Sequence, residues 1–347
     1  MTALEEIIIA MIETEGPMPF DRYMALCLGH PTHGYYMTRD PFGVMGDFTT
    51  APEISQVFGE LIGVWLLNAW TALASPPRFA LVELGPGRGT LMADILRAAK
   101  ALPEFIKAAE VHLVETSPVL CALQGEKLET VNWHHSVETL PPLPALIIAN
   151  EFFDALPVKQ FENRAGRWFE CCVGYGESGL KLGLVPAASR RGAEGVHEAS
   201  AVSVAIANDL GAHIAKYGGA ALVIDYGHLK SGVGDTVQAL RQHQFVSILQ
   251  DVGEADVTAH VDFEALANGF MAGGAELLPM LTQGGFLKAM GLDMRTEKLA
   301  AKLEGKAHDE FTKASRRLAD ADKMGNLFKV MAVAQKQRQP LYPFEGA

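Results

Sequence analysis

The sequence lacks the cysteine spacing of zinc-binding and thiol-redox proteins. It has four cysteines in 347 residues, at positions 27, 121, 171 and 172, and no two of them form a C-x-x-C pair. Zinc knuckles and thioredoxin-like sites depend on that spacing. We therefore expect no metal site, and buried reduced thiols of the kind found in cytosol-like compartments.

Long apolar segments and positive charge are scarce as well. The longest apolar stretch, residues 61–74, is interrupted by Asn68 and is shorter than the roughly 20 residues that span a bilayer. Lys and Arg number 29 against 41 Asp and Glu, a formal net charge of −12 at pH 7. Because nucleic-acid binders concentrate positive charge, this balance favours a cationic small molecule or a basic protein segment as partner. The acidic N-terminus resembles neither a secretory signal nor a transit peptide, so we expect a soluble protein of the cytoplasm.

Residues 1–75 have a mainly helical pattern and are expected to form an N-terminal helical cover. Apolar residues recur at helical spacing from Leu4 until the pair Gly16-Pro17, and a second short helix is expected at residues 21–28. A loop rich in Gly, Pro and His follows. It ends at Thr50 and Glu53, whose spacing predicts a capping box with a long apolar helix behind it.

Short apolar runs alternate with helical stretches from residue 79 onward. Runs at residues 79–84, 111–114, 145–149, 221–224 and 327–334 predict strands, and helices are expected at residues 91–102, 118–128 and 199–217. Continuous apolar runs are typical of buried parallel strands, so we predict a doubly wound α/β sheet within a domain of residues 76–347. Aromatic and β-branched residues with turn pairs predict antiparallel strands inserted at about 158–200. A second insertion, at about 227–270, shows no clear pattern.

The first of these strands runs into a glycine-rich turn, V-E-L-G-P-G-R-G-T, at residues 82–90. Its G-x-G-x-G pattern has Thr90 where a dinucleotide-binding turn has its third glycine, and the chain has no P-loop motif. Glu83 would repel a pyrophosphate but suits a ligand with sulfonium and ammonium groups. The turn therefore predicts S-adenosyl-L-methionine as cofactor. The residues expected to hold it here are Glu83, Gly85, Pro86, Gly87 and Gly89. Alternatively, Glu83 only pins the loop by accepting backbone N–H bonds.

Four further residues are expected to complete the cofactor site. Glu115 ends the second strand, where a carboxylate can accept bonds from both ribose hydroxyls, and Ser117 begins the next helix. Glu138 lies where an adenine amine is expected, and Asn150 follows the strand at residues 145–149. Alternatively, Glu115 and Glu138 are solvated acids that do not contact the cofactor. Residues 46–53 are expected to fold over the cofactor as a lid. Alternatively, they only form the start of the helix that follows them in the sequence.

Two acids, Glu151 and Asp154, follow the same strand and are the predicted catalytic residues. Ligands of open α/β sheets bind beyond the carboxyl ends of the strands. Carboxylates grip the planar fork of a guanidinium, so the pair favours arginine as methyl acceptor. Alternatively, Asp154 only caps a helix. Asp225, Tyr226 and His260 are expected to line the acceptor pocket, although His260 also fits a half-buried structural histidine.

Six patches in one order carry a family resemblance: GDFTTAPEISQVFGELIGVW at 46–65, VELGPGRGTL at 82–91, VETSPVL at 114–120, IANEFFDALPVKQF at 148–161, IDYG at 224–227 and DVTAHVDF at 256–263. With them the chain resembles the MidA-like class I methyltransferases, which are related to the mitochondrial complex I assembly protein that methylates arginine. The resemblance implies a Rossmann-like seven-stranded sheet with inserted elements. It implies that Gly85, Gly87, Gly89 and Glu115 hold the cofactor and that Glu151 grips the guanidinium. It also implies an arginine acceptor on the iron–sulfur subunit of NADH dehydrogenase. In one departure, the second acid is an aspartate only three residues on, where typical arginine methyltransferases have a second glutamate in a longer loop.

The sequence thus predicts a protein arginine N-methyltransferase that supports complex I assembly. We expect it in a bacterial cytoplasm, or in the mitochondrial matrix if it is a processed organellar homologue. The alternatives are a methyltransferase of a small molecule and a non-catalytic assembly factor on the same fold. An NAD-linked oxidoreductase is disfavoured by Thr90 and Glu83. The sequence specifies no oligomeric state.

Overall fold

The computed structural model describes residues 1–41, 50–336 and 341–344. The chain forms two compact units, each assembled from separate segments. Of the described residues, the first unit comprises 1–41, 153–205 and 228–265, and the second comprises 50–152, 206–227, 266–336 and 341–344. The division of the chain at residue 75 stays a prediction.

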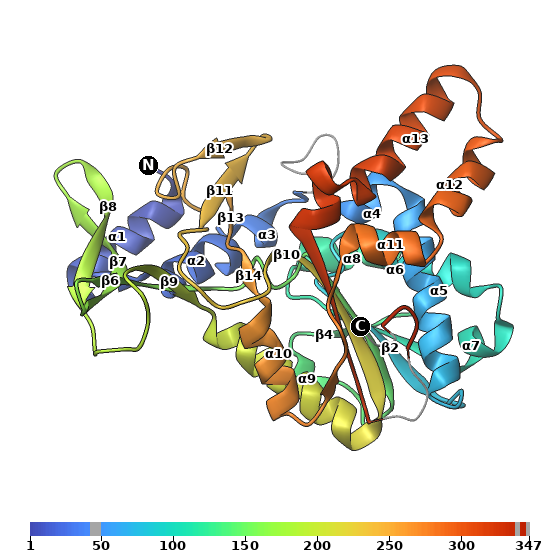
Figure 1. The fold of residues 1–347 in the computed structure, drawn as a ribbon. Helices are drawn as coiled ribbons and strands as arrows, with labels where there is room; N and C mark the ends of the chain where they lie inside the picture. The colour runs from blue at the N-terminus through green and yellow to red at the C-terminus, as the bar shows by residue number, and fades with distance from the viewer. Residues whose placement is uncertain (42–49, 337–340, 345–347) are drawn as a thin grey trace. The chain divides into compact units, whose positions relative to one another are not determined.

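A mixed sheet forms the centre of the second unit (Figure 1). Its strands are β2 (Phe79–Leu84), β3 (Ala109–Val114), β4 (Asn132–His134), β5 (Ala145–Asn150), β10 (Gly219–His228), β15 (Glu276–Leu277), β16 (Leu281–Thr282) and β17 (Phe328–Ala334). In the described residues the path of hydrogen-bonded neighbours is β15-β17-β10-β5-β2-β3-β4. Strands β4, β3, β2, β5 and β10 run parallel, and β17 is antiparallel to β10. This seven-strand path confirms the predicted fold class.

Helices cover both faces of this sheet. Those of the second unit are α4 (Ala51–Ile54), α5 (Gln56–Ala72), α6 (Thr90–Ala99), α7 (Pro103–Ala108), α8 (Pro118–Lys127), α9 (Ala201–Tyr217), α10 (Phe263–Ala272), α11 (Gln283–Ala289), α12 (Leu292–Ala300) and α13 (Gly305–Ala319). Helices α5 and α6 lie on one side of the sheet, and α9 and α10 lie on the other (Figure 1). Because both faces are covered, β2 and β5 are buried along their whole length, which explains their continuous apolar sequences. No helix in the described ranges is long and apolar enough to cross a membrane.

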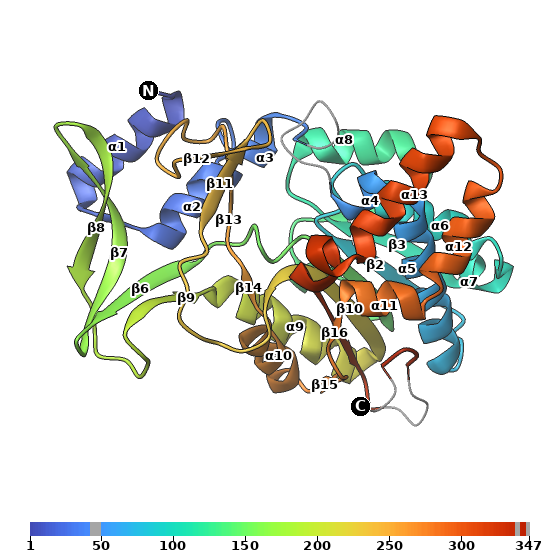
Figure 2. The same cartoon turned by 45° about the horizontal axis from the view of Figure 1, so that its top comes forward.

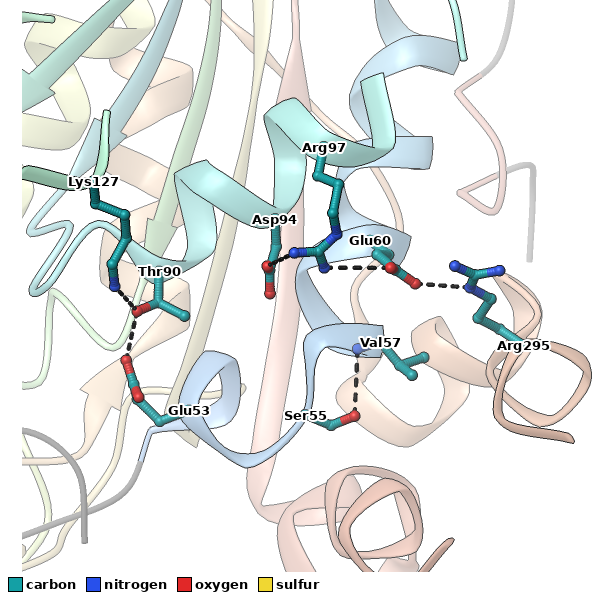
Figure 3. A network of polar contacts seen from close by, with 9 residues as sticks. All are labelled: Glu53, Ser55, Val57, Glu60, Thr90, Asp94, Arg97, Lys127 and Arg295. Atoms are coloured by element: carbon teal, nitrogen blue, oxygen red, sulfur yellow. Dashed lines mark hydrogen bonds and ion pairs between the residues drawn. The ribbon is translucent and has the colours of Figure 1, made fainter. Parts of the chain in front are cut away.

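Helices α5 and α6 pack at unusually short range. A Cβ atom on Gly59 would lie 2.5 Å from the Cβ of Asp94, so only glycine fits there. Beside this contact the buried Glu60 accepts hydrogen bonds from Arg97 Nη2 at 3.3 Å and Arg295 Nε at 2.7 Å (Figure 3). The network ties α12 to α5 through Arg295 and α6 to α5 through Arg97. Arg97 also pairs with Asp94 on its own helix at 2.7 Å.

The long helix expected after Thr50 begins five residues later than its predicted start. Thr50 makes no side-chain capping bond, and α4 is a single turn that ends at Ile54. Ser55 is extended, with φ −157° and ψ 131°, and its hydroxyl caps α5 by accepting the Val57 N–H at 3.3 Å. The predicted capping box of Thr50 and Glu53 is therefore wrong. A capping box is present instead at Thr2 and Glu5, where the first helix begins.

In its described residues, the first unit combines three helices with antiparallel strands. Its elements are α1 (Ala3–Glu15), β1 (Met18–Pro19), α2 (Phe20–Gly29), α3 (Tyr35–Thr38), β6 (Lys159–Arg164), β7 (Arg167–Gly176), β8 (Gly179–Pro186), β9 (Gly195–Ala199), β11 (Gln238–Arg241), β12 (Gln244–Val246), β13 (Asp256–Thr258) and β14 (Val261–Asp262). Strands β6, β7 and β8 follow one another through tight turns (Figure 2). The turn at Ala165 and Gly166 has positive φ angles of 50° and 81°, as a two-residue hairpin requires. The helix predicted at residues 21–28 and the presence of inserted antiparallel strands are thus confirmed.

Candidate cofactor and catalytic site

The glycine-rich turn connects β2 to α6 in a conformation that needs glycine. Gly85, Gly87 and Gly89 have φ angles of 59°, 52° and 72°, in the left-handed region that other residues rarely adopt. The turn is closed by a bond from the Gly89 N–H to the Pro86 carbonyl at 2.8 Å. Such a turn exposes backbone that Cβ atoms would otherwise shield, which fits the close approach of a ligand.

Glu83 lies beneath this turn and is almost completely buried, with 3% of its surface exposed. Burial raises the pKa of Glu83 to about 8, although a hydrogen bond from the Met92 backbone acts in the opposite direction. At neutral pH the neutral acid is therefore favoured, which argues against the predicted ionic contact with a sulfonium. The bond from Met92 agrees with the alternative that Glu83 pins the loop. Direct cofactor binding by Glu83 stays a prediction.

Glu115 follows β3, and its carboxylate stabilises the turn between β3 and α8. Its Oε1 accepts the backbone N–H groups of Thr116 and Ser117, each at 2.8 Å. Burial raises the pKa of Glu115, and these hydrogen bonds partly oppose that shift. The hydroxyl of Ser117 caps α8 by accepting the Leu120 N–H at 3.3 Å. An ionised carboxylate has about four acceptor positions, so this bonding leaves Glu115 compatible with the predicted ribose contact.

Gln124 is a residue of this region that the sequence motifs do not reveal. Its side chain is fully buried on α8. The Nε2 atom donates to the Gly87 carbonyl at 2.7 Å and to Glu115 Oε2 at 3.3 Å, and the Oε1 atom accepts from Trp133 Nε1 at 2.8 Å. Gln124 therefore joins the glycine turn, the acid after β3 and strand β4.

Two other predicted cofactor residues lie in the short helix before β5 and at the end of β5. Glu138 is exposed in a short 3-10 helix at Val137–Thr139. Asn150 is buried at the end of β5, and its Nδ2 donates to Glu151 Oε1 at 3.3 Å. Contacts of both side chains with the cofactor stay predictions.

Glu151 occupies a conformation that is unusual for its residue type. Its φ angle is 49°, in the left-handed region, and its backbone N–H donates to the Ile224 carbonyl at 2.9 Å. Its Oε1 atom accepts from the Ala51 backbone N–H at 3.0 Å. Non-glycine residues held in this region store strain and cluster at functional sites, which supports the predicted role of Glu151.

Asp225 supports the turn that carries Glu151. The Asp225 side chain is fully buried. Its Oδ2 accepts the Phe152 N–H at 3.2 Å, and its Oδ1 accepts the Tyr226 N–H at 2.9 Å. The ring of Tyr226 meets Phe328 edge-on at 5.4 Å between centroids. Burial favours a structural role for Asp225, and acceptor contacts of Asp225 and Tyr226 stay predictions.

Asp154 and His260 belong to the first unit, whereas Glu151 belongs to the second. Asp154 is buried, and its carbonyl accepts the Ala259 N–H at 3.0 Å. The neighbouring His260 N–H donates to Thr236 Oγ1 at 2.9 Å. Acceptor binding by Asp154 and His260 stays a prediction. Of the expected cofactor lid at residues 46–53, residues 46–49 lie outside the described residues.

The glycine turn is also linked to α4. Thr90, the first residue of α6, donates its hydroxyl hydrogen to Glu53 Oε1 at 2.6 Å (Figure 3). Thr90 Oγ1 accepts from Lys127 Nζ at 2.7 Å. The acid that was expected to cap its own helix therefore binds a residue 37 positions further along the chain.

Residues 61–279 match the family described as S-adenosyl-L-methionine-dependent methyltransferase. The chain belongs to this family. It is 35% identical over 364 residues to the Danio rerio protein arginine methyltransferase NDUFAF7, mitochondrial, with 93% of this chain and 85% of the relative covered. Its identity to the Homo sapiens protein of the same name is also 35%, covering 94% of this chain and 82% of the relative.

A solved structure from Burkholderia thailandensis, bound to S-adenosyl-homocysteine, has the same fold. The TM-score is 0.85 at 27% sequence identity, and the match covers 98% of this chain and 93% of that one. Membership of the MidA-like methyltransferases and S-adenosyl-L-methionine as cofactor are therefore confirmed. The left-handed glycine turn and the acid after β3 fit this cofactor.

Proposed function

We propose that the protein is an S-adenosyl-L-methionine-dependent protein arginine N-methyltransferase in which Glu151 anchors the guanidinium of the acceptor. The observation that carries the proposal is the strained backbone of Glu151, with φ 49°, at the carboxyl end of β5. Relatives from Danio rerio and Homo sapiens that match most of the chain are named protein arginine methyltransferases, which supports arginine as the acceptor.

The position of Glu151 suits this role because its turn packs against the cofactor turn. Strand β5 pairs with β2, which leads into Gly85. A Cβ atom on Gly85 would lie 2.8 Å from the ring of Phe152, the residue after Glu151. A carboxylate placed there can bind guanidinium N–H groups and turn one nitrogen toward the methyl donor. We assign Asp154 as a second anchor of the acceptor.

The chemistry is a displacement in line. When bound, S-adenosyl-L-methionine supplies an electrophilic methyl group. A guanidinium nitrogen forms the new N–C bond as the S–C bond breaks, the electron pair of that bond stays on the sulfur of the departing thioether, and the nitrogen loses one proton to solvent. The protein contributes orientation, because reacting atoms held in line at near-attack distance react far faster than free ones. Glu151 also stabilises the positive charge that remains on the acceptor.

Two finer assignments belong to the same proposal. The acceptor is an iron–sulfur subunit of NADH dehydrogenase, so that methylation supports assembly of that complex. The protein acts in a bacterial cytoplasm, or in the mitochondrial matrix if it is organellar. Methyl transfer to purified NADH dehydrogenase subunits, compared with transfer into a whole-cell lysate, tests the acceptor.

The decisive experiment is transfer of radiolabelled methyl groups followed by amino-acid analysis of the labelled protein. Label in methylated arginine is expected, and label in another residue or in a small molecule contradicts the proposal. Glu151→Gln should lower the rate by about 100-fold or more, the size of effect seen when one transition-state contact is removed. It should leave the dissociation constant of S-adenosylhomocysteine within about threefold of wild type. Glu129→Gln, at an exposed position after α8, is the matched control.

A further inference from the structure

We propose that α4 is a bracket that fixes the Glu151 carboxylate relative to the cofactor turn, and that Glu53 is the positioning residue that holds this bracket. This inference rests on the proposed function, because it assumes that Glu151 contacts the acceptor. It gives Glu53 a role different from the helix cap and the cofactor lid that its place in the sequence predicted. Both ends of the bracket are visible as hydrogen bonds within the second unit.

One end of α4 is fastened to the cofactor turn. Thr90 directly follows Gly89, whose φ of 72° forms the last bend of that turn. The Thr90 hydroxyl accepts from Lys127 Nζ at 2.7 Å, and its single hydrogen is directed at Glu53 Oε1 at 2.6 Å (Figure 3). The bond is short and charge-assisted, which makes it stronger and more directional than a neutral one.

The other end of α4 reaches the proposed catalytic acid. The Ala51 N–H donates to Glu151 Oε1 at 3.0 Å, and Ala51 is completely buried. The carbonyl of Thr50, the residue before α4, accepts the N–H groups of Glu53 at 2.9 Å and Ile54 at 3.1 Å. The turn is therefore braced internally, and a displacement of Glu53 is passed on to the Ala51 N–H.

The end contacts add to the burial of Ala51 and Pro52 in fixing α4, because the helix is too short to hold itself. It has four residues, and a single turn does not repay the cost of helix nucleation. The extended Ser55 separates it from α5, so the longer helix does not continue into it. Partly exposed polar contacts such as that between Glu53 and Thr90 contribute little to overall stability. Removing the contact should therefore affect positioning much more than folding.

The test is a double-mutant cycle between Glu53→Ala and Thr90→Val, each of which removes one partner of the bond. Each variant should lower kcat about tenfold while the dissociation constant of S-adenosylhomocysteine and the melting temperature stay near wild type. The double variant should be no slower than either single variant, because both remove the same contact. Glu53→Gln and Thr90→Ser keep an acceptor and a hydroxyl, so they should recover most of the activity. Glu126→Ala, at an exposed position on α8, controls for the loss of one acid.

A measurement that needs no methyl acceptor distinguishes this inference from the proposed function. Hydrogen exchange of the Ala51 amide, measured by NMR, should speed up in Glu53→Ala and in Thr90→Val but not in Glu126→Ala. Unchanged exchange at Ala51, additive effects in the cycle, or a weaker cofactor affinity that accounts for the whole loss of rate would each overturn the bracket. If the wild-type protein methylates no arginine, the proposed function fails, while the exchange result still decides the link between Glu53 and Ala51.

Discussion

Phe152 packs directly against Gly85. A Cβ atom on Gly85 would come within 2.8 Å of Phe152 Cδ2, closer than real Cβ atoms approach their neighbours. Phe152 directly follows Glu151. The turn that carries the proposed catalytic acid therefore packs against the glycine-rich turn that fits the cofactor. Glycine is needed at residue 85 both for this contact and for its φ of 59°.

Gly85→Ala should therefore damage cofactor binding. The methyl group would displace the Phe152 ring and strain the backbone, at a cost of about 1–3 kcal/mol for the strain alone. We expect S-adenosylhomocysteine to bind at least about tenfold more weakly by calorimetry, where 1.4 kcal/mol corresponds to a factor of ten. Gly166→Ala is the control, because its φ is 81° and nothing lies within 4 Å of its added Cβ atom. That variant should lose stability and keep its affinity, and equal losses of affinity in the two variants would refute the packing argument.

Asp225→Asn should weaken the support beneath Glu151. Asparagine keeps one acceptor oxygen but presents an amide NH₂ group to one of the two backbone N–H groups that the buried carboxylate now binds. A buried donor that loses its acceptor costs about 1–3 kcal/mol. We expect a lower melting temperature by calorimetry and a lower kcat, since the Phe152 N–H helps to hold the strained turn. The comparison is Asp209→Asn on the exposed face of α9; if Asp225→Asn matches it in both measurements, Asp225 has no supporting role.

Much of the central sheet was predictable because its inner strands are buried on both sides. Strand β2 coincides with the predicted range of residues 79–84, and β5 extends the predicted run at 145–149 by Asn150. Strand β4 was not predicted, because it lies at the sheet edge and its residues Asn132 and Trp133 are exposed. The antiparallel direction of β17 was also missed, since hydrophobic pattern carries no information on strand direction.

The polar contacts were harder to predict, since their partners are far apart in the sequence. Glu53 has the spacing of a capping residue, but Thr90 binds its carboxylate instead. Gln124 belongs to no motif, and its role depends on the Gly87 carbonyl, 37 positions away. The sequence shows that Glu83 is acidic but not that it is buried, which is the property that decides its charge.

Gln124→Glu should loosen the cofactor site without removing any side-chain volume. The carboxylate can still accept from Trp133 Nε1, but it cannot donate to the Gly87 carbonyl or to Glu115. Leaving the buried carbonyl without its donor costs about 1–3 kcal/mol, so S-adenosylhomocysteine affinity should fall by about tenfold or more. Gln244→Glu on the exposed strand β12 makes the same change of charge away from the site. Equal affinities in these two variants, measured by calorimetry, would rule out Gln124 as an organiser of the turn.

Glu83→Gln should change how stability depends on pH. Burial raises the pKa of Glu83 from 4.5 to about 8 in the folded protein, so the folded state binds a proton that the unfolded chain has released between those values. The stabilising contribution of the protonated acid is therefore complete below pH 4.5 and is lost as the pH rises toward 8. Glutamine resembles the neutral acid at every pH, so the variant should gain stability relative to wild type from pH 5 to pH 8. Urea unfolding across this range measures that difference, with Glu129→Gln as the baseline for losing an exposed carboxylate. A difference from wild type that stays constant with pH would mean that Glu83 is ionised beneath the turn, as a direct partner of the sulfonium requires.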